Sequence, residues 1–361
     1  MKRFGILSGV AIAALCLSAC ASDTVEEEVS DVEASPAPSV SVVVTTTILG
    51  DIAGEILTCA LGDDSSLTVL MPAGADPHDF QASSSQVAEM ASADFVLING
   101  LGLEEGLTDV FEELIREGVN VMEAASLIDP IPFGEKADDH ADHDDHADHD
   151  DHADHDDHAD HDDHADHDDH SEDADDHADH DDHAHGDFDP HFWFDMSRMA
   201  TVTELVSAEL GAITGVNFAD CGAEIASEIR ASELVVAETL SVVPDSGRVL
   251  LTDHDALAYF ADKYDFEVVG VVIPGGSTLG EPSSGDLAEL VEVIKSRNVG
   301  AIFGNSATSP NLLNALANEV GSEVQVVDLF VGSLGDEASG ANSYLKMMEL
   351  NAVRISEALT N

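Results

Sequence analysis

The stretch RVLLTDHDALAYFADKYDFEVVGVVI, residues 248–273, decides the fold class. A short apolar run ends at Thr252, a segment with helical spacing of apolar residues follows, and a second β-branched run begins at Glu267. Strand, helix and strand in succession predict a βαβ unit, in which the two strands lie parallel in one sheet.

The same alternation recurs on both sides of this stretch. The predicted strands are Ser41–Thr47, Leu67–Leu70, Asp94–Ile98, Val119–Glu123, Arg248–Thr252, Glu267–Ile273, Gly300–Phe303 and Glu323–Asp328. The predicted helices are Ile48–Ala60, Ser84–Ala91, Gly106–Glu117, Met196–Thr214, Phe218–Val242, Asp255–Tyr264, Leu287–Arg297, Asn311–Val320 and Gly340–Leu359. About four strands per half are too few and too separated for one barrel, so we predict two α/β lobes with parallel sheets, joined by a long helix.

Domain boundaries follow from this pattern. The first lobe is expected over residues 40–137, the return segment and connecting helices over 188–242, and the second lobe over 243–361. The chain has 361 residues, of which 44% are hydrophobic, so it is long enough for two packed cores. With 74 acidic and 12 basic residues its formal net charge is −62, which excludes nucleic acid as a partner and disfavours attraction to anionic lipid.

The first residues have the pattern of an export signal. Lys2 and Arg3 precede an apolar stretch, Phe4–Leu17, that is too short to span a bilayer permanently. The following Leu17-Ser18-Ala19-Cys20 resembles the lipobox of bacterial lipoproteins, in which residues 1–19 are removed and Cys20 carries the lipid. An ordinary signal peptide with an incidental cysteine is the alternative.

The lipid anchor also fixes the expected location. Residues 20–39 are acidic, contain serine and proline and lack aromatic residues, so we expect a disordered tether. The protein is then exported and held by lipid alone at the outer face of the cytoplasmic membrane, or on its periplasmic side in a Gram-negative cell. After lipidation of Cys20 and loss of Cys16, the remaining cysteines, Cys59 and Cys221, form one disulfide or are two unrelated small buried residues.

A low-complexity insertion separates the two halves over residues 138–187. The unit Asp-Asp-His-Ala-Asp-His occurs five times in succession from Asp138 to His167, and degenerate copies follow. The segment has no apolar face and is expected to be disordered, with many weak metal sites. Its histidines are His140, His143, His146, His149, His152, His155, His158, His161, His164, His167, His170, His177, His180, His183 and His185.

Only three histidines lie outside this insertion, and each occupies a distinctive motif. His78 lies in ADPHDF, His191 in DPHFWFD and His254 in TDHDA. His78 and His254 follow predicted strands, at the sheet edge where open α/β folds bind ligands, and Asp328 ends the last predicted strand. Three neutral imidazoles and one carboxylate are a suitable donor set for zinc.

These motifs together resemble one family over essentially the whole mature chain. The lipobox, ADPHDF, the His-rich insertion, DPHFWFD, TDHDALAYFADKYDF, VVDLFVGSLG and SYLKMMELNAVRISEAL are similar to those of the zinc- and manganese-binding solute receptors of ABC importers. The resemblance implies two (β/α)4 lobes joined by one rigid long helix, with the metal between the lobes. It also implies a monomer that works with a permease and its ATPase. The ligands implied are His78, His191, His254 and Asp328.

The third ligand position distinguishes the metals within that family. Manganese receptors have Glu where this chain has His254, and imidazole suits zinc whereas carboxylate suits manganese. We therefore expect Zn2+, bound as the transported ligand; a manganese or iron receptor is the alternative.

Two other classes of protein have to be considered. A zinc-dependent hydrolase would use the same three imidazoles with an open position for water, and Glu281, Asp253 and Asp255 are acidic residues that could act as its base. The sequence has no His-Glu-x-x-His, Gly-x-Ser-x-Gly or phosphate-binding glycine loop, so we expect no enzyme and no catalytic residues. A surface adhesin is supported by nothing except location.

Overall fold

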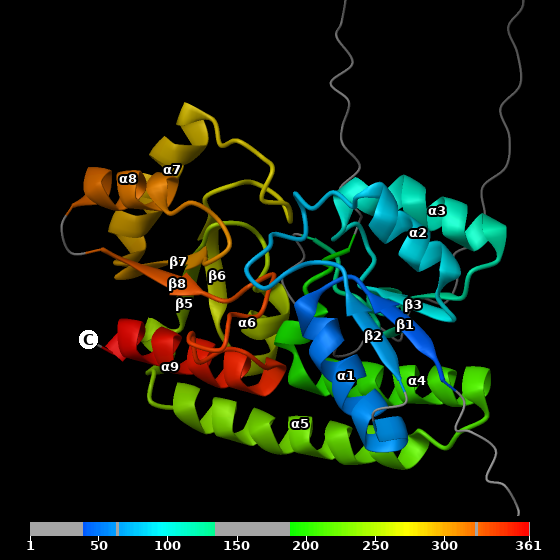
Figure 1. Cartoon of the computed structure of the whole chain (residues 1–361). Coiled ribbons are helices and arrows are strands. Elements are labelled where there is room, and N and C mark those ends of the chain that lie inside the picture. The colour runs from blue at the N-terminus through cyan, green and yellow to red at the C-terminus, as the bar shows by residue number, and fades with distance from the viewer. Residues whose placement is uncertain (1–38, 63–64, 134–187, 322–323, 361) are drawn as a thin grey trace, which may run out of the picture. The chain divides into compact units, whose positions relative to one another are not determined.

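The computed structural model describes residues 39–62, 65–133, 188–321 and 324–360 of the chain (Figure 1). The predicted signal peptide, Cys20, most of the tether and the insertion over 138–187 with its fifteen histidines lie outside the described residues.

The first lobe is built on a four-stranded parallel sheet. Its strands lie in the order β2-β1-β3-β4. They are β1 (Ser41–Val44), β2 (Ser66–Val69), β3 (Phe95–Ile98) and β4 (Val121–Glu123), with helices α1 (Thr47–Leu61), α2 (Ser84–Ser92) and α3 (Thr108–Glu117). Val42 and Val44 pack on the side of α1, whereas Val43 packs with Met90 of α2 and Phe111 of α3. Because both faces are covered, the central strands β1 and β3 are apolar except for Ser41 at the start of β1.

The second lobe repeats this construction. Its strands lie in the order β6-β5-β7-β8, all parallel. They are β5 (Val249–Thr252), β6 (Glu267–Val271), β7 (Ala301–Asn305) and β8 (Gln325–Leu329), with helices α6 (Ala258–Tyr264), α7 (Ser284–Arg297) and α8 (Asn311–Val320). Two α/β lobes with parallel sheets are therefore confirmed. The last strand runs one residue beyond the predicted end, to Leu329.

Three long helices complete the fold: α4 (Met196–Thr214), α5 (Ala219–Leu240) and α9 (Tyr344–Thr360). Helix α5 packs along α4 and also contacts α1 of the first lobe and α9, which follows the second lobe (Figure 1). This arrangement agrees with a connecting helix. The final helix begins at Tyr344, where the Asp51 carboxylate accepts the Tyr344 N–H at 2.8 Å, and not at the predicted Gly340.

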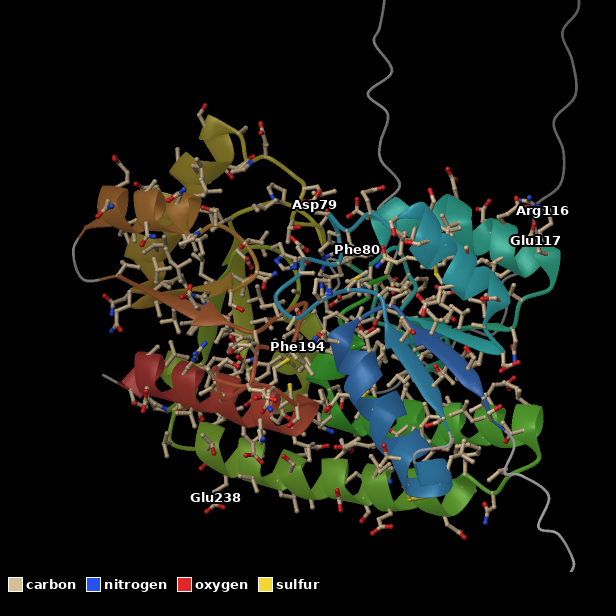
Figure 2. All side chains as sticks on the ribbon, viewed as in Figure 1. Asp79, Phe80, Arg116, Glu117, Phe194 and Glu238 are labelled. Carbon is tan, nitrogen blue, oxygen red and sulfur yellow. A yellow bond between two sulfur atoms is a disulfide. The ribbon has the colours of Figure 1, made fainter. Side chains whose placement is uncertain are left out.

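An aromatic cluster, Phe192–Phe194, joins these parts. All three side chains are buried, and Phe194 lies in the interior (Figure 2). The Trp193 indole donates to the Val331 carbonyl at 3.0 Å, and the Tyr344 hydroxyl donates to the Trp193 carbonyl at 2.7 Å. The only tryptophan of the chain is thus fixed by hydrogen bonds at the centre of the core.

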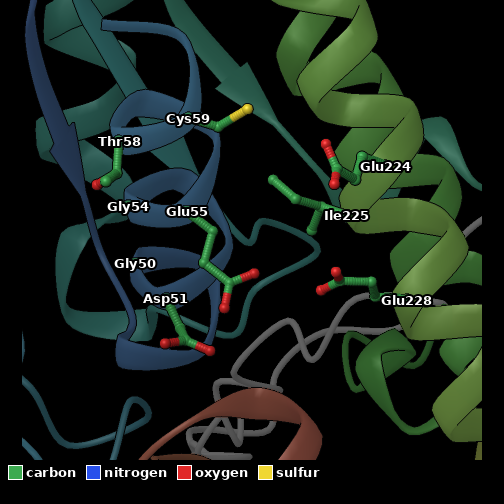
Figure 3. Close-up of a pocket in the computed structure, with 9 residues that line it drawn as sticks. All are labelled: Gly50, Asp51, Gly54, Glu55, Thr58, Cys59, Glu224, Ile225 and Glu228. Carbon is green, nitrogen blue, oxygen red and sulfur yellow. The ribbon is translucent and has the colours of Figure 1, made fainter. Parts of the chain in front are cut away.

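The structure joins Cys59 of α1 to Cys221 of α5 by a disulfide, with a Cα–Cα distance of 5.9 Å. Beside it, a cavity of about 570 Å³ opens between the two helices (Figure 3). Its lining includes the carboxylates of Asp51, Glu55, Glu224 and Glu228. Burial raises the pKa of the Glu55 carboxyl, and the neighbouring charges of Asp51 and Glu228 act in the same direction.

Candidate metal centre

The three histidines predicted as ligands come from three separate segments. His78 lies in the loop that follows β2, two residues before Phe80 (Figure 2). His191 directly precedes the short 3-10 helix η4 (Phe192–Phe194), and His254 follows the carboxyl end of β5. Each side chain is at most 3% exposed. Because parallel strands end at one edge of a sheet, β2 and β5 deliver their histidines to the ligand-binding edges of the two lobes.

These segments bring the three imidazoles together. The ring centroids are 5.5 Å apart for His78 and His191, 5.6 Å for His78 and His254, and 5.2 Å for His191 and His254. One nitrogen of each ring lies within 4.8 Å of the other two. Among the described residues this is the only set of three or more His, Cys, Asp or Glu side chains that converges in this way. The acidic cavity beside the disulfide does not.

A carboxylate lies against the Nδ1 atom of each imidazole. Asp189 Oδ1 is 2.7 Å from His191 Nδ1, and Asp253 Oδ1 is 2.9 Å from His254 Nδ1. The third approach is longer, with 3.3 Å between Glu105 Oε1 and His78 Nδ1. An ionised carboxylate only accepts, so wherever Asp189 and Asp253 are ionised, Nδ1 of His191 and of His254 carries a hydrogen, and Nε2 is the nitrogen left to ligate a metal.

The Nε2 atoms have no hydrogen-bond partner. This holds for His78, His191 and His254 alike, although all three atoms are buried. A buried polar atom without a partner is costly and unusual in a folded protein. Because the three rings converge, these unpartnered nitrogens are candidate metal donors, and carboxylates behind imidazoles are the common arrangement around metal-binding histidines.

Burial and neighbouring charges set the protonation of this cluster. Burial holds the pKa of His191 well below its ordinary value, and the adjacent His254 and His78 lower it further, so its imidazole is neutral. For His254 burial acts in the same direction, but the Asp253 carboxylate outweighs it and raises the pKa. Burial raises the pKa of Asp189 to about 7. A neutral imidazole is the form that ligates a metal.

The structure does not bring Asp328 to the three histidines. Its side chain is exposed, and it does not belong to the converging group. Side chains alternate along a strand, so Asp328 shares a face with Val326, which packs toward the core formed with α7 and α8. Val327 and Leu329 occupy the opposite face, toward the central core. The Asp328 carbonyl accepts from Arg354 Nη1 at 2.7 Å.

The carboxylates behind the imidazoles are not predictable as a group from the sequence. Asp189 and Asp253 lie two and one residues before their histidines, and both also accept the histidine backbone N–H, at 2.8 Å and 2.9 Å. The repeated Asp-Pro-His motif gave a signal for Asp189. In the first lobe Asp76 likewise accepts the His78 N–H, but its other oxygen accepts from Thr278 Oγ1 of the second lobe, and Glu105 lies against His78 Nδ1 instead.

Comparison with known proteins agrees with this geometry. A model of the family described as "Zinc-uptake complex component A periplasmic" matches residues 42–171 and 157–358. The zinc-binding protein TroA of Treponema pallidum is 28% identical over 320 residues, 87% of each chain. The manganese-binding lipoprotein MntA of Bacillus subtilis is 25% identical over 366 residues, 99% of each chain.

A solved structure extends the likeness to the fold. The structure of periplasmic zinc-binding TroA from T. pallidum matches with a TM-score of 0.67 at 26% identity, over 90% of this chain and all of that one.

Within the described residues of the present chain, no helix combines the length and apolar character that crossing a membrane requires.

Proposed function

This chain belongs to the family of periplasmic component A proteins of zinc-uptake complexes, metal-binding substrate receptors of ABC importers, and from that premise we propose that its transported ion is Zn2+. As a receptor of this kind it binds a metal ion outside the cytoplasm and works with a permease and an ATPase.

The donor set carries the proposal. His78, His191 and His254 each offer one imidazole nitrogen, and among the described residues no carboxylate belongs to the converging group. Imidazole suits zinc, whereas manganese prefers carboxylate and water. Three nitrogens and one further ligand complete a tetrahedron with Zn–N bonds of about 2.0–2.1 Å. Manganese is the second candidate because the relative MntA is named for it.

A titration of metal-free protein tests the choice of ion. The protein is prepared without residues 138–187, so that the histidines of the insertion do not contribute, and Zn2+ and Mn2+ are titrated separately and in competition. We expect one tightly bound Zn2+ per chain that Mn2+ does not displace. Equal affinity for the two ions, or displacement of zinc by manganese, would overturn the proposal.

Single substitutions test the ligands. Replacing His78, His191 or His254 by Ala removes one of three nitrogen donors, and each variant should lose zinc affinity by at least about 100-fold, the upper end of the loss for partners behind the ligands. Asp328→Asn serves as the control because its side chain is exposed and lies outside the group. A histidine variant that binds zinc as tightly as the wild type would exclude that residue from the site.

We also propose that Cys20 carries a lipid that anchors the protein to the outer face of the cytoplasmic membrane. The support is the Leu17-Ser18-Ala19-Cys20 sequence, together with curated relatives that are named lipoproteins. Cys20→Ser should release the protein from the membrane fraction. A mutant that stays in that fraction would exclude the lipid anchor.

A further inference from the structure

The loop after β3, residues 99–105, touches two of the three histidine segments. At its end, the Glu105 carboxylate lies 3.3 Å from His78 Nδ1. At its start, the Asn99 side-chain amide donates to the carbonyl of Pro190, next to His191, at 3.0 Å. One loop thus contacts the surroundings of two histidines that are far apart in sequence.

This loop has a conformation that needs external support. Gly100, Leu101 and Gly102 have φ values of 85°, 51° and 80°, in the left-handed region. The region is unfavourable for Leu101 because its Cβ approaches the following carbonyl. A Cβ on Gly100 would lie 1.9 Å from Glu123 Cγ, so glycine is required there. Glu123 Oε1 accepts the Leu101 N–H at 2.7 Å and holds the strained residue in place.

The principal support is the buried side chain of Glu104, which is 2% exposed. Its Oε1 accepts from Thr45 Oγ1 at 2.5 Å and from the Asn99 N–H at 2.8 Å, and its Oε2 accepts from the Gly100 N–H at 3.1 Å. These partners all donate, so the side chain acts only as an acceptor. Glu104 thus links Asn99 and Gly100, the first two residues of the loop, to Thr45 at the end of β1. The same bonds hold the backbone at Glu104, directly before Glu105.

We propose that Glu104 is a positioning residue of the metal centre, which through the loop over residues 99–105 holds Glu105 against His78 and Asn99 against Pro190. Glu104 does not contact the three histidines directly. It acts through Asn99 and Glu105. The inference rests on the proposed metal-binding role of His78 and His191. Loss of partners one step removed from the ligands commonly weakens metal affinity 10–100-fold.

Glu104→Gln in the full chain is the test. The amide keeps the shape of the side chain, but its NH2 group would face one of the groups that donate to Glu104. We expect zinc affinity to fall about 10–100-fold while the far-UV circular dichroism is retained. Glu117→Gln is the matched control: it makes the same substitution at the exposed outer end of α3 (Figure 2) and should change affinity by less than about 2-fold.

A double-mutant cycle with Glu105→Gln separates positioning from general weakening of the fold. If Glu104 acts through Glu105, the double variant binds zinc as tightly as Glu104→Gln alone, within about 2-fold. Losses that multiply would overturn the proposal, and so would a folded Glu104→Gln protein with unchanged affinity. Thr45→Val, which removes one donor to Glu104, gives the same cycle if Glu104→Gln does not fold.

The readout also keeps this inference apart from the choice of ion. Each variant is compared with the wild type for Zn2+ and for Mn2+, and the ratio of variant to wild-type affinity tests the role of Glu104. The ratio of the two ions in the wild type tests the proposed zinc function. A wild type that prefers manganese would overturn the proposed zinc function. The role of Glu104 would still be decided by the ratio of variant to wild-type affinity.

Discussion

Removing the disulfide between Cys59 and Cys221 should destabilise the protein strongly without changing its metal site. The variant is Cys59→Ser with Cys221→Ala, because Cys59 is exposed whereas Cys221 is buried in the first turn of α5. The bond ties α1 to α5, and none of the three converging histidines lies on either helix. Stability and zinc affinity should therefore respond differently.

The expected loss follows from the length of chain that the bond closes. The two cysteines are 162 residues apart. In the chain-entropy model, closing a loop of this length lowers the conformational entropy of the unfolded chain by about 17 cal/mol/K. At 25 °C this corresponds to about 5 kcal/mol of stabilisation. Measured losses on removing native disulfides fall at about 2–5 kcal/mol. The free energy of unfolding should fall by an amount in that range.

Urea unfolding provides the measurement, followed by the fluorescence of Trp193, the only tryptophan. A soluble form beginning at Ala21 has no other cysteine, so the reduced wild type is a direct control and should unfold like the variant. Without the cross-link the unfolded chain exposes more surface, and the slope of unfolding free energy against urea should increase. The zinc affinity of the folded variant should stay within about 2-fold of the wild type.

A fall of less than about 1 kcal/mol in the free energy of unfolding would refute the reasoning, because the constraint on the unfolded chain would then be negligible. Two free thiols in the native exported protein would refute its premise.

Three further results are expected. His254→Glu replaces a nitrogen donor by a hard oxygen and should lower the ratio of zinc to manganese affinity by about 10-fold or more in competition titrations; an unmoved ratio would remove His254 from the site. Deleting residues 138–187 should abolish weak, multiple, pH-sensitive zinc binding in calorimetry and leave one tight ion, whereas loss of the tight ion would show that the insertion supplies a primary ligand. Asp328→Asn should leave zinc affinity within about 2-fold, and a larger loss would return Asp328 to the ligand set.

The fold was predictable because its strands are short apolar runs separated by helices with clear periodicity. Ser41–Val44 and Phe95–Ile98 are apolar almost throughout, as expected of strands covered on both faces. Local details depended on tertiary contacts that no pattern encodes. The register between β5 and β6 shifts between Leu250 and Leu251, where Gly270 pairs with Leu251. The start of α9 depends on Asp51, which is 293 residues away in sequence.

The histidine cluster was predictable for a different reason. Outside the insertion only three histidines remain, and two of them follow strands at ligand-binding edges. The supporting carboxylates could not be chosen in the same way, because 74 acidic residues offer too many candidates. Glu105 reaches His78 from the loop after β3, whose residues receive tertiary hydrogen-bond support from Glu104 and include positive-φ positions, and neither feature can be located from sequence.

The expectation for Asp328 depended on where the last strand ends. The strand was predicted to end at Asp328, which would have put the carboxylate at the sheet edge with His254. In the structure β8 continues to Leu329, and alternation turns Asp328 outward while Leu329 enters the core. The segment that follows carries Val331, whose carbonyl fixes Trp193, and Trp193 lies edge-on to His191 at 5.3 Å. The end of β8 therefore contacts the site through packing, whereas the exposed side chain of Asp328 lies outside the converging group.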